Sequence, residues 1–476
     1  MPLVLGIDSS TQSTKVEARD VDTGAVVARG SAAHPPTTPP VSEQDPGAWW
    51  VALTEAIAQI GDHRRDVVAL SVAGQQHGLV LLDHDGQPLR PAKLWNDTTS
   101  APQAARLVEL LGAERWAAMT GSVPVAAFTI TKLAWVADHE PGLLERTAKL
   151  LLPHDYLTWR LTGLHVTDRG DASGSGWFDP TSGNVLPELL AAATGGDGDA
   201  WLDRVPRVLA PDQPAGTIAA VAARSLGLPE GVIVGPGSGD NMGAALGLGL
   251  RAGDVAISLG TSGTVFAVSD TATHDPSGAV AGFASASGNF LPLVCTLNAT
   301  KVTDTVAGWL GTDPQGLAEL ALAAVEQPGS ATLVPYFDGE RTPNLPDATG
   351  TFTGLTNSTT REQLALAAHD GVLCGLLGGV DALRAVGATV GGRVFLIGGG
   401  ARSVAYRQRC ADLLAHTVTV PDSDETVAAG AAVQAATIWS GAPIADVSHR
   451  WNLGEGIHVE PKTDAAAIRH RYPPHP

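Results

Sequence analysis

The sequence predicts an α/β protein of two domains, and three observations lead to this fold class. The chain has 476 residues, which is too many for one ordinary hydrophobic core. Strand patterns alternate with helical patterns along most of its length, as in sheets that are covered by helices. Residues 3–20 and 255–270 each read as a strand, a turn of small polar residues and a second strand. We therefore expect one domain over residues 1–246 and a second over residues 247–476.

The first domain is expected to continue from its hairpin with strands and helices in alternation. Short apolar runs predict strands, and a 3.6-residue period predicts helices. The strands are expected at 67–74, 79–83 and 231–237, a helix at 101–116, and a strand that leads into a helix at 149–163. The Pro-rich residues 34–46 are expected to form a surface loop.

The second domain is expected to follow its own hairpin with longer helices. Residues 360–387 have the length and pattern of one long helix. Residues 393–415 read as a strand, a glycine turn and a helix, and residues 424–440 read as a helix of small residues suited to close packing.

Composition and charge exclude several classes of protein. Apolar residues make up 44% of the chain and charged residues 17%, as in globular proteins, and no run of roughly 18 apolar residues occurs. The net charge of −19 argues against nucleic acid and anionic membranes as partners. The 3 cysteines are far apart, so neither a disulfide framework nor a thiolate zinc site is expected. With no secretory signal at the start, we expect a cytoplasmic protein.

The two hairpin turns are candidate phosphate sites. The sequence has neither a P-loop nor a strict GxGxxG, so a nucleotide would need another device. Backbone N–H groups and hydroxyls in a Ser/Thr/Gly turn can hold anionic oxygens, and two such turns could grip a phosphate from opposite walls of a cleft. The residues in question are Thr11, Gln12, Ser13 and Thr14 in the first turn and Gly260 and Thr261 in the second.

Two further features are ambiguous from the residues alone. Asp8 ends the first strand, where its carboxylate could hold Mg²⁺, directly or through water, or accept hydrogen bonds from its own turn. The glycine turn after residue 396 could support a flat aromatic base or be an ordinary strand-to-helix connection. Its candidate residues are Gly399, Gly400, Ala401 and Ser403.

At this level of detail the chain resembles the FGGY carbohydrate kinases of the actin–hexokinase superfamily. The resemblance is carried in order by "GIDSSTQSTKV", "AGQQHG", "LWND", "GSGDNMGAALG", "ISLGTSGTVFAVS" and "LIGGGARS", and it covers the chain from residue 6 to about residue 435. It implies two ribonuclease-H-like domains flanking a deep cleft that binds ATP, Mg²⁺ and a ketose. The motifs are most similar to those of members that convert D-xylulose to D-xylulose 5-phosphate. Related kinases are often homodimers.

Asp240 is the candidate catalytic base. It lies among glycines at 235, 237, 239 and 243, which are expected to let both substrates approach closely. Phosphoryl transfer needs one group to accept the hydroxyl proton, and the resemblance assigns that role to Asp240. On spacing alone, Asp240 could equally cap a helix that begins at Asn241, and one carboxylate could do both.

Sugar recognition is expected from loops of the first domain. The resemblance implies that Gln76 and His77 contact the ketose. The following loop offers an aromatic face and two polar groups, although core packing is a simpler role for Trp95. The other candidates are Trp95, Asn96, Asp97 and Asn241. Many family members have an arginine where this chain has Thr99, which leaves the exact sugar open, and Glu340 and Arg341 could form either an ion pair or part of a site.

Three rival readings remain at this point. The first is another kinase of the family, acting on ribulose, gluconate, fuculose or glycerol. The second is a non-catalytic nucleotide clamp, which would need no base at Asp240. The third is a glycosidase that uses Asp8 and Asp240, for which the phosphate-type turns would have no purpose.

Overall fold

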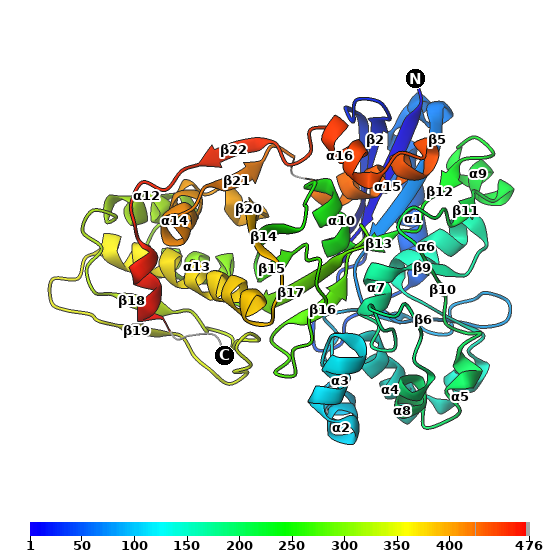
Figure 1. The fold of residues 1–476 in the computed structure, drawn as a ribbon, viewed down its shortest axis with the longest axis horizontal. Coiled ribbons are helices and arrows are strands. Elements are labelled where there is room, and N and C mark those ends of the chain that lie inside the picture. The colour runs from blue at the N-terminus through cyan, green and yellow to red at the C-terminus, as the bar shows by residue number, and fades with distance from the viewer. Residues whose placement is uncertain (424, 473–476) are drawn as a thin grey trace.

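Two β-sheets, each covered by helices, organise the chain (Figure 1). The computed structural model describes residues 1–423 and 425–472. The first sheet has the strand order β11 (Gly216–Thr217), β12 (Ile233–Val234), β5 (Val67–Gly74), β1 (Leu3–Ser9), β2 (Ser13–Asp20) and β3 (Val26–Ala33), with β13 (Ser238–Gly239) also paired to β5. The second has the order β16 (Ala281–Ala284), β17 (Phe290–Thr296), β15 (Gly263–Ala267), β14 (Gly253–Leu259), β20 (Val390–Ile397), β21 (Val418–Pro421) and β22 (Gly456–Val459).

The centres of the two sheets repeat one arrangement. β1 pairs antiparallel with β2 and parallel with β5. β14 pairs antiparallel with β15 and parallel with β20. Each predicted hairpin therefore contributes the central strand of its sheet, and the α/β fold with an internal repeat is confirmed.

Helices lie on the faces and at the ends of both sheets (Figure 1). Those before β14 are α1 (Pro46–Gln59), α2 (Ala101–Leu111), α3 (Ala113–Thr120), α4 (Thr129–His139), α5 (Pro141–Arg146), α6 (Pro153–Thr162), α7 (Arg169–Ser173), α8 (Pro187–Thr194), α9 (Ala220–Leu226) and α10 (Asp240–Gly247). Those after it are α11 (Thr300–Trp309), α12 (Pro314–Ala323), α13 (Arg361–Ala385), α14 (Val404–Leu414), α15 (Thr426–Ser440) and α16 (Ile444–Arg450).

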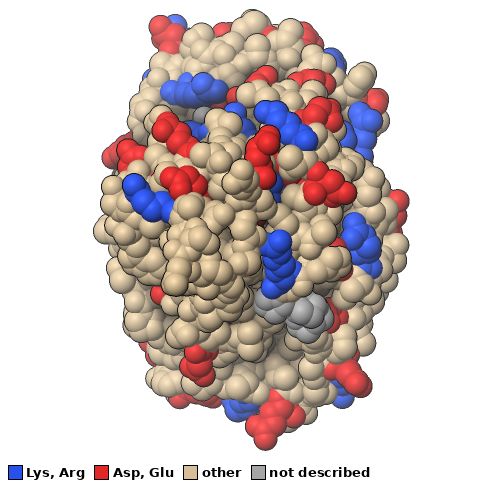
Figure 2. Space-filling model, turned by 90° about the vertical axis from the view of Figure 1, so that its left-hand side faces the viewer, with Lys and Arg blue, Asp and Glu red and all other residues tan. Residues whose placement is uncertain are grey.

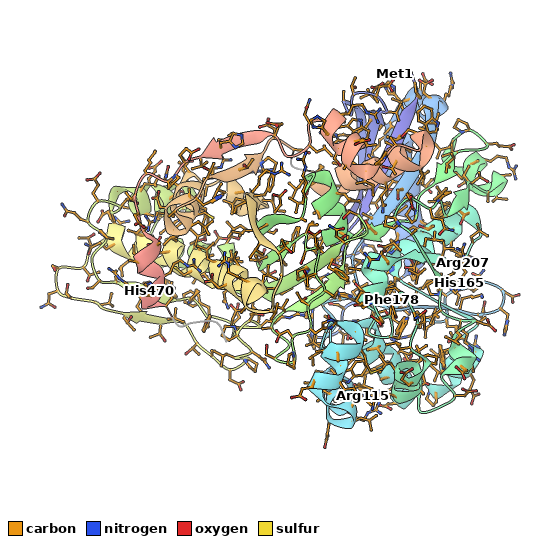
Figure 3. The ribbon with its side chains drawn as sticks, in the orientation of Figure 1. Met1, Arg115, His165, Phe178, Arg207 and His470 are labelled. Carbon is orange, nitrogen blue, oxygen red and sulfur yellow. The ribbon has the colours of Figure 1, made fainter. Side chains whose placement is uncertain are left out.

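Short strand pairs and 3₁₀ turns complete the description. The pairs are β4 (Glu43–Gln44) with β7 (Ala92–Lys93), β6 (Val80–Leu82) with β8 (Lys149–Leu151), β9 (Val166–Asp168) with β10 (Arg207–Leu209), and β18 (Thr332–Val334) with β19 (Thr351–Thr353). The 3₁₀ turns are η1 (Gly61–Asp66), η2 (Asp199–Trp201), η3 (Gly399–Arg402) and η4 (Ala466–Arg471). Met1 lies beside the first sheet and His470 lies in η4, against the second half of the molecule (Figure 3).

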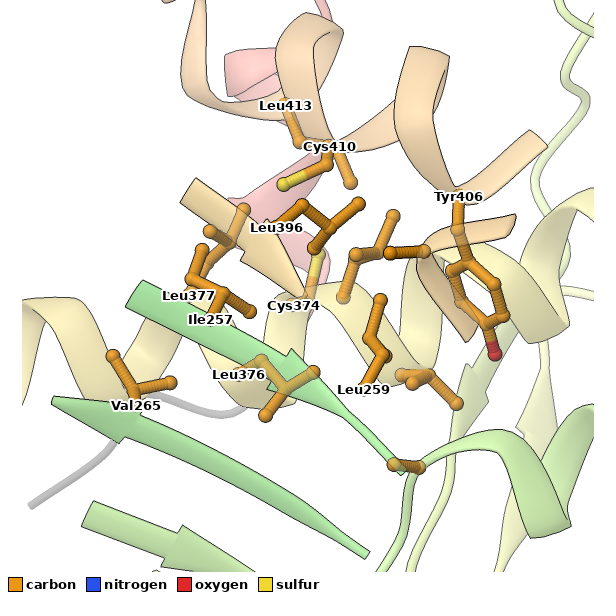
Figure 4. Packing of buried hydrophobic residues seen from close by; sticks show 14 of the residues in the cluster. Ile257, Leu259, Val265, Cys374, Leu376, Leu377, Leu396, Tyr406, Cys410 and Leu413 are labelled. Carbon is orange, nitrogen blue, oxygen red and sulfur yellow. The ribbon is translucent and has the colours of Figure 1, made fainter. Parts of the chain in front are cut away.

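Each sheet has its own hydrophobic core. In the second half, Ile257 on β14 and Leu396 on β20 pack against Leu376 on α13 and Cys410 on α14 (Figure 4). The long helix α13 is apolar enough to cross a membrane, but 83% of its most apolar window is buried inside the protein, as in a core helix. On the outer face drawn in Figure 2, basic and acidic side chains are interspersed.

Helix α15 belongs to the second half of the chain but packs on the first sheet. It contacts β1 and β5 of the first sheet and runs against α10. The approach is close because glycines meet backbone: a Cβ atom at Gly430 would overlap the carbonyl oxygen of Gly243, and one at Gly6 would overlap that of Ala428. The small residues predicted for this helix thus join the two halves.

Three expectations of the sequence need correction or restriction. The helix expected at 101–116 is two helices, because Gly112 has φ +83° and ends α2 before α3 begins. The strand expected at 231–237 is only Ile233–Val234, since Pro236 lacks an N–H group and Gly237 has φ +84°. The helix expected at 424–440 is found at Thr426–Ser440, and residue 424 lies outside the described residues.

Candidate active site

Two pockets lie between the sheets, and they meet at Asp240. Pocket A, of about 340 Å³, is bordered by the loop of residues 76–77 after β5, the end of α10 and the second hairpin. Pocket B, of about 380 Å³, is bordered by the first hairpin, the end of α10 and the glycine turn around η3. Asp240, Asn241 and Ser258 line both pockets. A group that passes from one ligand to another between these pockets would pass Asp240.

Asp240 is held in place by its neighbour on the same helix. It is the first residue of α10, and its Oδ1 accepts hydrogen bonds from the backbone N of Asn241 at 2.8 Å and from the Nδ2 of Asn241 at 3.0 Å. Burial and the nearby carboxylate of Asp8 raise the pKa of Asp240 to about 7. The expected cap at Asp240 does not form, because α10 begins at Asp240 with Gly239 in the N-cap position and no side-chain cap bond. The carboxyl group is held by Asn241 and has a pKa suited to a base near neutral pH.

The glycines around Asp240 serve a different purpose from the one expected. A Cβ atom at Gly235 would meet Ser71, one at Gly237 would meet His154, and one at Gly239 would meet Gln76. These are atoms of the protein and not open space. The expectation that the glycines clear room for the substrates is wrong; they let the loop that carries Asp240 pack tightly on its support.

Gln76 and His77 both line pocket A. Gln76 accepts a hydrogen bond from the Nδ2 of Asn241 at 2.8 Å, while its own Nε2 is buried without a partner among the described residues. The His77 ring stacks on Phe128 with centroids 5.1 Å apart, and burial lowers its pKa to about 3. The imidazole is therefore neutral, and Nδ1 has no partner in the described part of the chain. Gln76 therefore keeps an unused amide nitrogen, whereas the Nδ1 of His77 lies against the backbone of Gly174.

The loop of residues 95–97 contributes less to the pocket than expected. Trp95 lines pocket A and donates from Nε1 to the Oγ1 of Thr11 at 2.9 Å. Asp97 has no exposed surface, and its carboxylate accepts from the backbone N of Ser42 at 2.9 Å and from Thr99. Asn96 is not among the residues that border either pocket. Asp97 therefore anchors its own loop, and the structure does not bring it to the pocket.

The first hairpin presents other residues to pocket B than those predicted. Ser10 and Lys15 line the pocket, and the hydroxyl of Ser10 donates to Asp8. Thr14 is fully buried and hydrogen-bonded to Ser9 and His34. The remaining candidates also lie outside both linings: Thr11, Gln12 and Ser13. The sequence missed Ser10 and Lys15, although both lie in the motif around Asp8.

The second hairpin lines pocket A with the residues next to those predicted. Ser262, Gly263 and Thr264 border the pocket. Gly260 and Thr261 do not, because their carbonyl oxygens accept from the backbone of residues 299 and 300 at the start of α11. The two hairpin turns therefore border different pockets, and the predicted phosphate residues Gly260 and Thr261 border neither of them.

The glycine turn has an open side that faces pocket B. Gly399 and Ala401 line the pocket, and a Cβ atom at Gly399 would meet nothing within 4 Å. Gly400 packs against Leu259, and Ser403 caps α14 through the backbone N of Tyr406. The turn is therefore open toward pocket B at Gly399, where no side chain or backbone atom of the described residues blocks the approach of a ligand.

Asp8 is buried and borders neither pocket, although Ser10, which donates to it, lines pocket B. Burial raises the pKa of Asp8 to about 6, against the hydrogen bond from Ser10 and the charge of Lys15. The described residues contain no group of three or more His, Cys, Asp or Glu side chains arranged to hold a metal ion. Mg²⁺ is usually held by one or two carboxylates with water and phosphate oxygens, so a cation in pocket B would meet Asp8 through water and beside Ser10.

Comparison with known proteins identifies the family. The N-terminal domain of the FGGY family of carbohydrate kinases matches residues 3–247, and the C-terminal domain of the same family matches residues 255–439. The chain belongs to this family. It is therefore an ATP-dependent sugar kinase, and the two pockets that meet at Asp240 are the sites to consider for its two substrates.

The relatives of this FGGY kinase share nearly its whole length. A xylulose kinase of Streptomyces coelicolor is 48% identical over 96% of this chain and 92% of its own length. A xylulose kinase of Streptomyces rubiginosus is equally similar, with the same coverage. The crystal structure of xylulose kinase from Bifidobacterium adolescentis has a TM-score of 0.89 and 42% identity, and the match covers 99% of both chains.

Proposed function

We propose that this kinase transfers the γ-phosphoryl group of ATP to O5 of D-xylulose and releases D-xylulose 5-phosphate and ADP. The observation that carries the proposal is the position of Asp240, at the only stretch of wall (with Asn241 and Ser258) that the described pockets A and B share. The name that the similar proteins carry supports D-xylulose as the acceptor.

In this proposal the ketose occupies pocket A and the nucleotide occupies pocket B. The lining of pocket A includes the polar groups of Gln76 and His77 and the indole of Trp95, besides the charged Asp240 and Arg341, and such groups can bind a polyol. Pocket B has the open face at Gly399 for the base, and Lys15 for phosphate oxygens once it leaves its ion pair with Glu425.

Asp240 acts as the general base. Its carboxylate accepts the proton of the O5 hydroxyl as the O5–phosphorus bond forms and the bond to the β-phosphate oxygen of ATP breaks. In a loose transition state the hydroxyl proton leaves late, so a carboxylate is basic enough. Asp8 would hold Mg²⁺ directly or through water, and the ion, when bound, neutralises charge on the phosphates.

The decisive experiment is an assay of ADP release over a panel of ketoses and polyols. The panel contains D-xylulose, ribulose, gluconate, fuculose and glycerol, with wild type and Asp240→Asn. We expect preference for D-xylulose in the wild type and a loss of about 10²- to 10⁴-fold in kcat in the variant.

An exposed carboxylate provides the control. Asp62→Asn changes a carboxylate that is 91% exposed and borders neither pocket, so it should leave kcat unchanged. Retained turnover in Asp240→Asn would remove the assignment of the base, and preference for another sugar would replace D-xylulose.

We also expect the enzyme in the cytoplasm, where its free Cys295, Cys374 and Cys410 would stay reduced.

A further inference from the structure

Arg341 lies in the wall of pocket A, and its positive charge has no partner among the residues that the structure describes. It follows Glu340 in the "GERTP" segment, and its side chain borders the pocket together with His77 and Asp240. Its backbone N donates to the Oε1 of Glu340 at 2.7 Å. Its guanidinium group makes no hydrogen bond or ion pair with any of the described residues. A planar group with five N–H donors is thus left free beside a ligand-sized cavity.

The internal ion pair that the sequence allowed for this segment does not form. Glu340 is buried, and its carboxylate is taken up by the backbone N of Leu297 at 2.6 Å and the Nδ2 of Asn298 at 3.0 Å, in addition to the N of Arg341. Asn298 also donates to the carbonyl oxygen of Gly339 at 2.6 Å. These bonds fix the backbone of Arg341 to the end of β17 and leave only its side chain free to meet a ligand.

The guanidinium group of Arg341 borders the same pocket as the loop of residues 76–77, and it does not border pocket B. It acts on that loop electrostatically, because its charge is one of the causes, after burial and Lys132, that lower the pKa of His77. Asp240 lies where pocket A joins pocket B, at the end where the phosphoryl group arrives. A ligand of pocket A therefore extends from Asp240 toward Arg341 and His77.

We propose that Arg341 is a sugar-contacting specificity residue whose guanidinium donates hydrogen bonds to O1 and O2 of the open-chain ketose, at the end away from O5. This inference rests on the function proposed above. The carbonyl oxygen at C2 and the hydroxyl at C1 are neighbouring acceptors, and the fork of a guanidinium can reach both. A sugar without them leaves the cation unpaired, which discriminates more strongly than a change in shape.

The first test measures sugar binding in the absence of ATP. Trp95 borders pocket A, so its fluorescence is the readout for D-xylulose titrated into wild type, Arg341→Met and Arg341→Lys. Arg341→Met should raise the Kd for D-xylulose at least about tenfold, and Arg341→Lys by a smaller factor because it keeps the charge and loses the fork. The Michaelis constant for ATP should stay unchanged, and kcat should stay within about threefold of wild type.

Arg384→Met is the matched control. Its side chain is 60% exposed and pairs with Asp381 near the end of α13, so its removal should leave the Kd unchanged. A fall in kcat for Arg341→Met with an unchanged sugar Kd would place the guanidinium on the phosphoryl group and overturn the proposal. An unchanged Kd and kcat would overturn it as well.

A second test asks which oxygens Arg341 contacts. Wild type should bind 1-deoxy-D-xylulose, which lacks the O1 hydroxyl, more weakly than D-xylulose, whereas Arg341→Met should bind the two with similar Kd values. An equal loss in both proteins would refute the contact with O1. If the wild type phosphorylates no sugar of the panel, the proposed function fails. If it prefers another sugar, the Arg341 titrations are run with that sugar. Failure of the proposed function and failure of the Arg341 inference are therefore distinguishable.

Discussion

At the scale of single residues, His154 supports the loop that carries Asp240. It is fully buried, its ring packs on Gly237, and its Nε2 lies 3.3 Å from Asp155, 3.2 Å from Asp168 and 3.6 Å from Asp171. Burial alone would lower the pKa of His154, but the surrounding carboxylates raise it to about 9. A buried cation thus lies beneath the candidate active site.

This charge predicts a loss of stability at alkaline pH. A histidine with a folded pKa of about 9 and an unfolded pKa of about 6.5 stabilises the fold fully below pH 6.5, and this contribution disappears as the pH rises through 9. We expect the free energy of unfolding, measured by urea denaturation, to fall between pH 6.5 and pH 9 by up to about 3 kcal/mol. His154→Gln should be less stable at pH 6.5 and show a smaller fall; an equal slope in both proteins would contradict the charge.

A second prediction concerns Gly237, where backbone strain and overlap with His154 can be separated. Gly237→Ala forces a Cβ atom onto the imidazole at φ +84°, whereas Gly112→Ala places one in open space at φ +83°. Gly112→Ala should cost about 1–2 kcal/mol of stability from strain alone. Gly237→Ala should cost more and also lower kcat, because the loop of Asp240 must shift; the two variants having equal effects would show that the overlap is unimportant.

The chemistry of single residues was predictable where it depended on residue type, and burial decided the rest. Asp240 and His77 border the pocket as the sequence suggested. Thr14 and Asp97 have side chains of the right kind, but both are fully buried in hydrogen bonds within the protein. The direction in which a polar side chain points depends on the packing of distant segments, and a motif does not contain that information. Arg341 was ambiguous for the same reason.

At the scale of elements, the contact between α10 and α15 depends on the absence of side chains. Gly247 on α10 and Gly430 on α15 lie where a Cβ atom would overlap the backbone of the other helix. Such positions cannot relax by rotating a side chain, so the helices themselves would have to separate.

Gly430→Ala should therefore destabilise the protein by several kcal/mol, with thermal unfolding as the measurement. Gly375→Ala is the matched control, because Gly375 lies inside α13 and a Cβ atom there meets nothing within 4 Å. The control should be neutral or more stable by up to about 1 kcal/mol, since alanine favours a helix. If both variants had the same melting temperature, close packing at Gly430 would not matter.

Elements followed from the sequence where periodicity was strong. The hairpins and α13 lie where predicted, because alternating strands and a long apolar repeat are local signals. The helix expected at 101–116 was divided by a glycine in the left-handed region, a conformation that the residue permits without requiring. The strand expected at 231–237 was shortened for a similar reason.

At the scale of the whole molecule, an ion pair in the lining of pocket B joins β2 to the residue before α15. Lys15 on β2 donates to both carboxylate oxygens of Glu425, at 2.8 and 2.7 Å, just before α15 begins. Both residues border pocket B, so a nucleotide that enters must meet or displace this pair. Without a nucleotide, the ammonium group of Lys15 is therefore already paired with a carboxylate and is not free to bind phosphate.

We expect hydrolysis of ATP to be slow until a ketose is bound. Water competes with the sugar as acceptor, and binding of the sugar can drive closure that expels water and assembles the site. Without ketose, the rate of ADP release should be at least about 100-fold below the rate with D-xylulose. Equal rates with and without sugar would mean that the open enzyme is already active.

The division of the chain at residues 246 and 247 stays a prediction.

The position of α15 also constrains how the chain can be made. The strands β1 and β5 emerge from the ribosome early, but the helix that contacts them is translated near the end. At a translation rate of about 5–20 residues per second, roughly 20 to 70 s pass between the synthesis of β5 and the synthesis of α15, which packs on it. During that interval the nascent chain exposes apolar surface of β1 and β5 that α15 covers in the finished enzyme, and a chaperone could bind this surface.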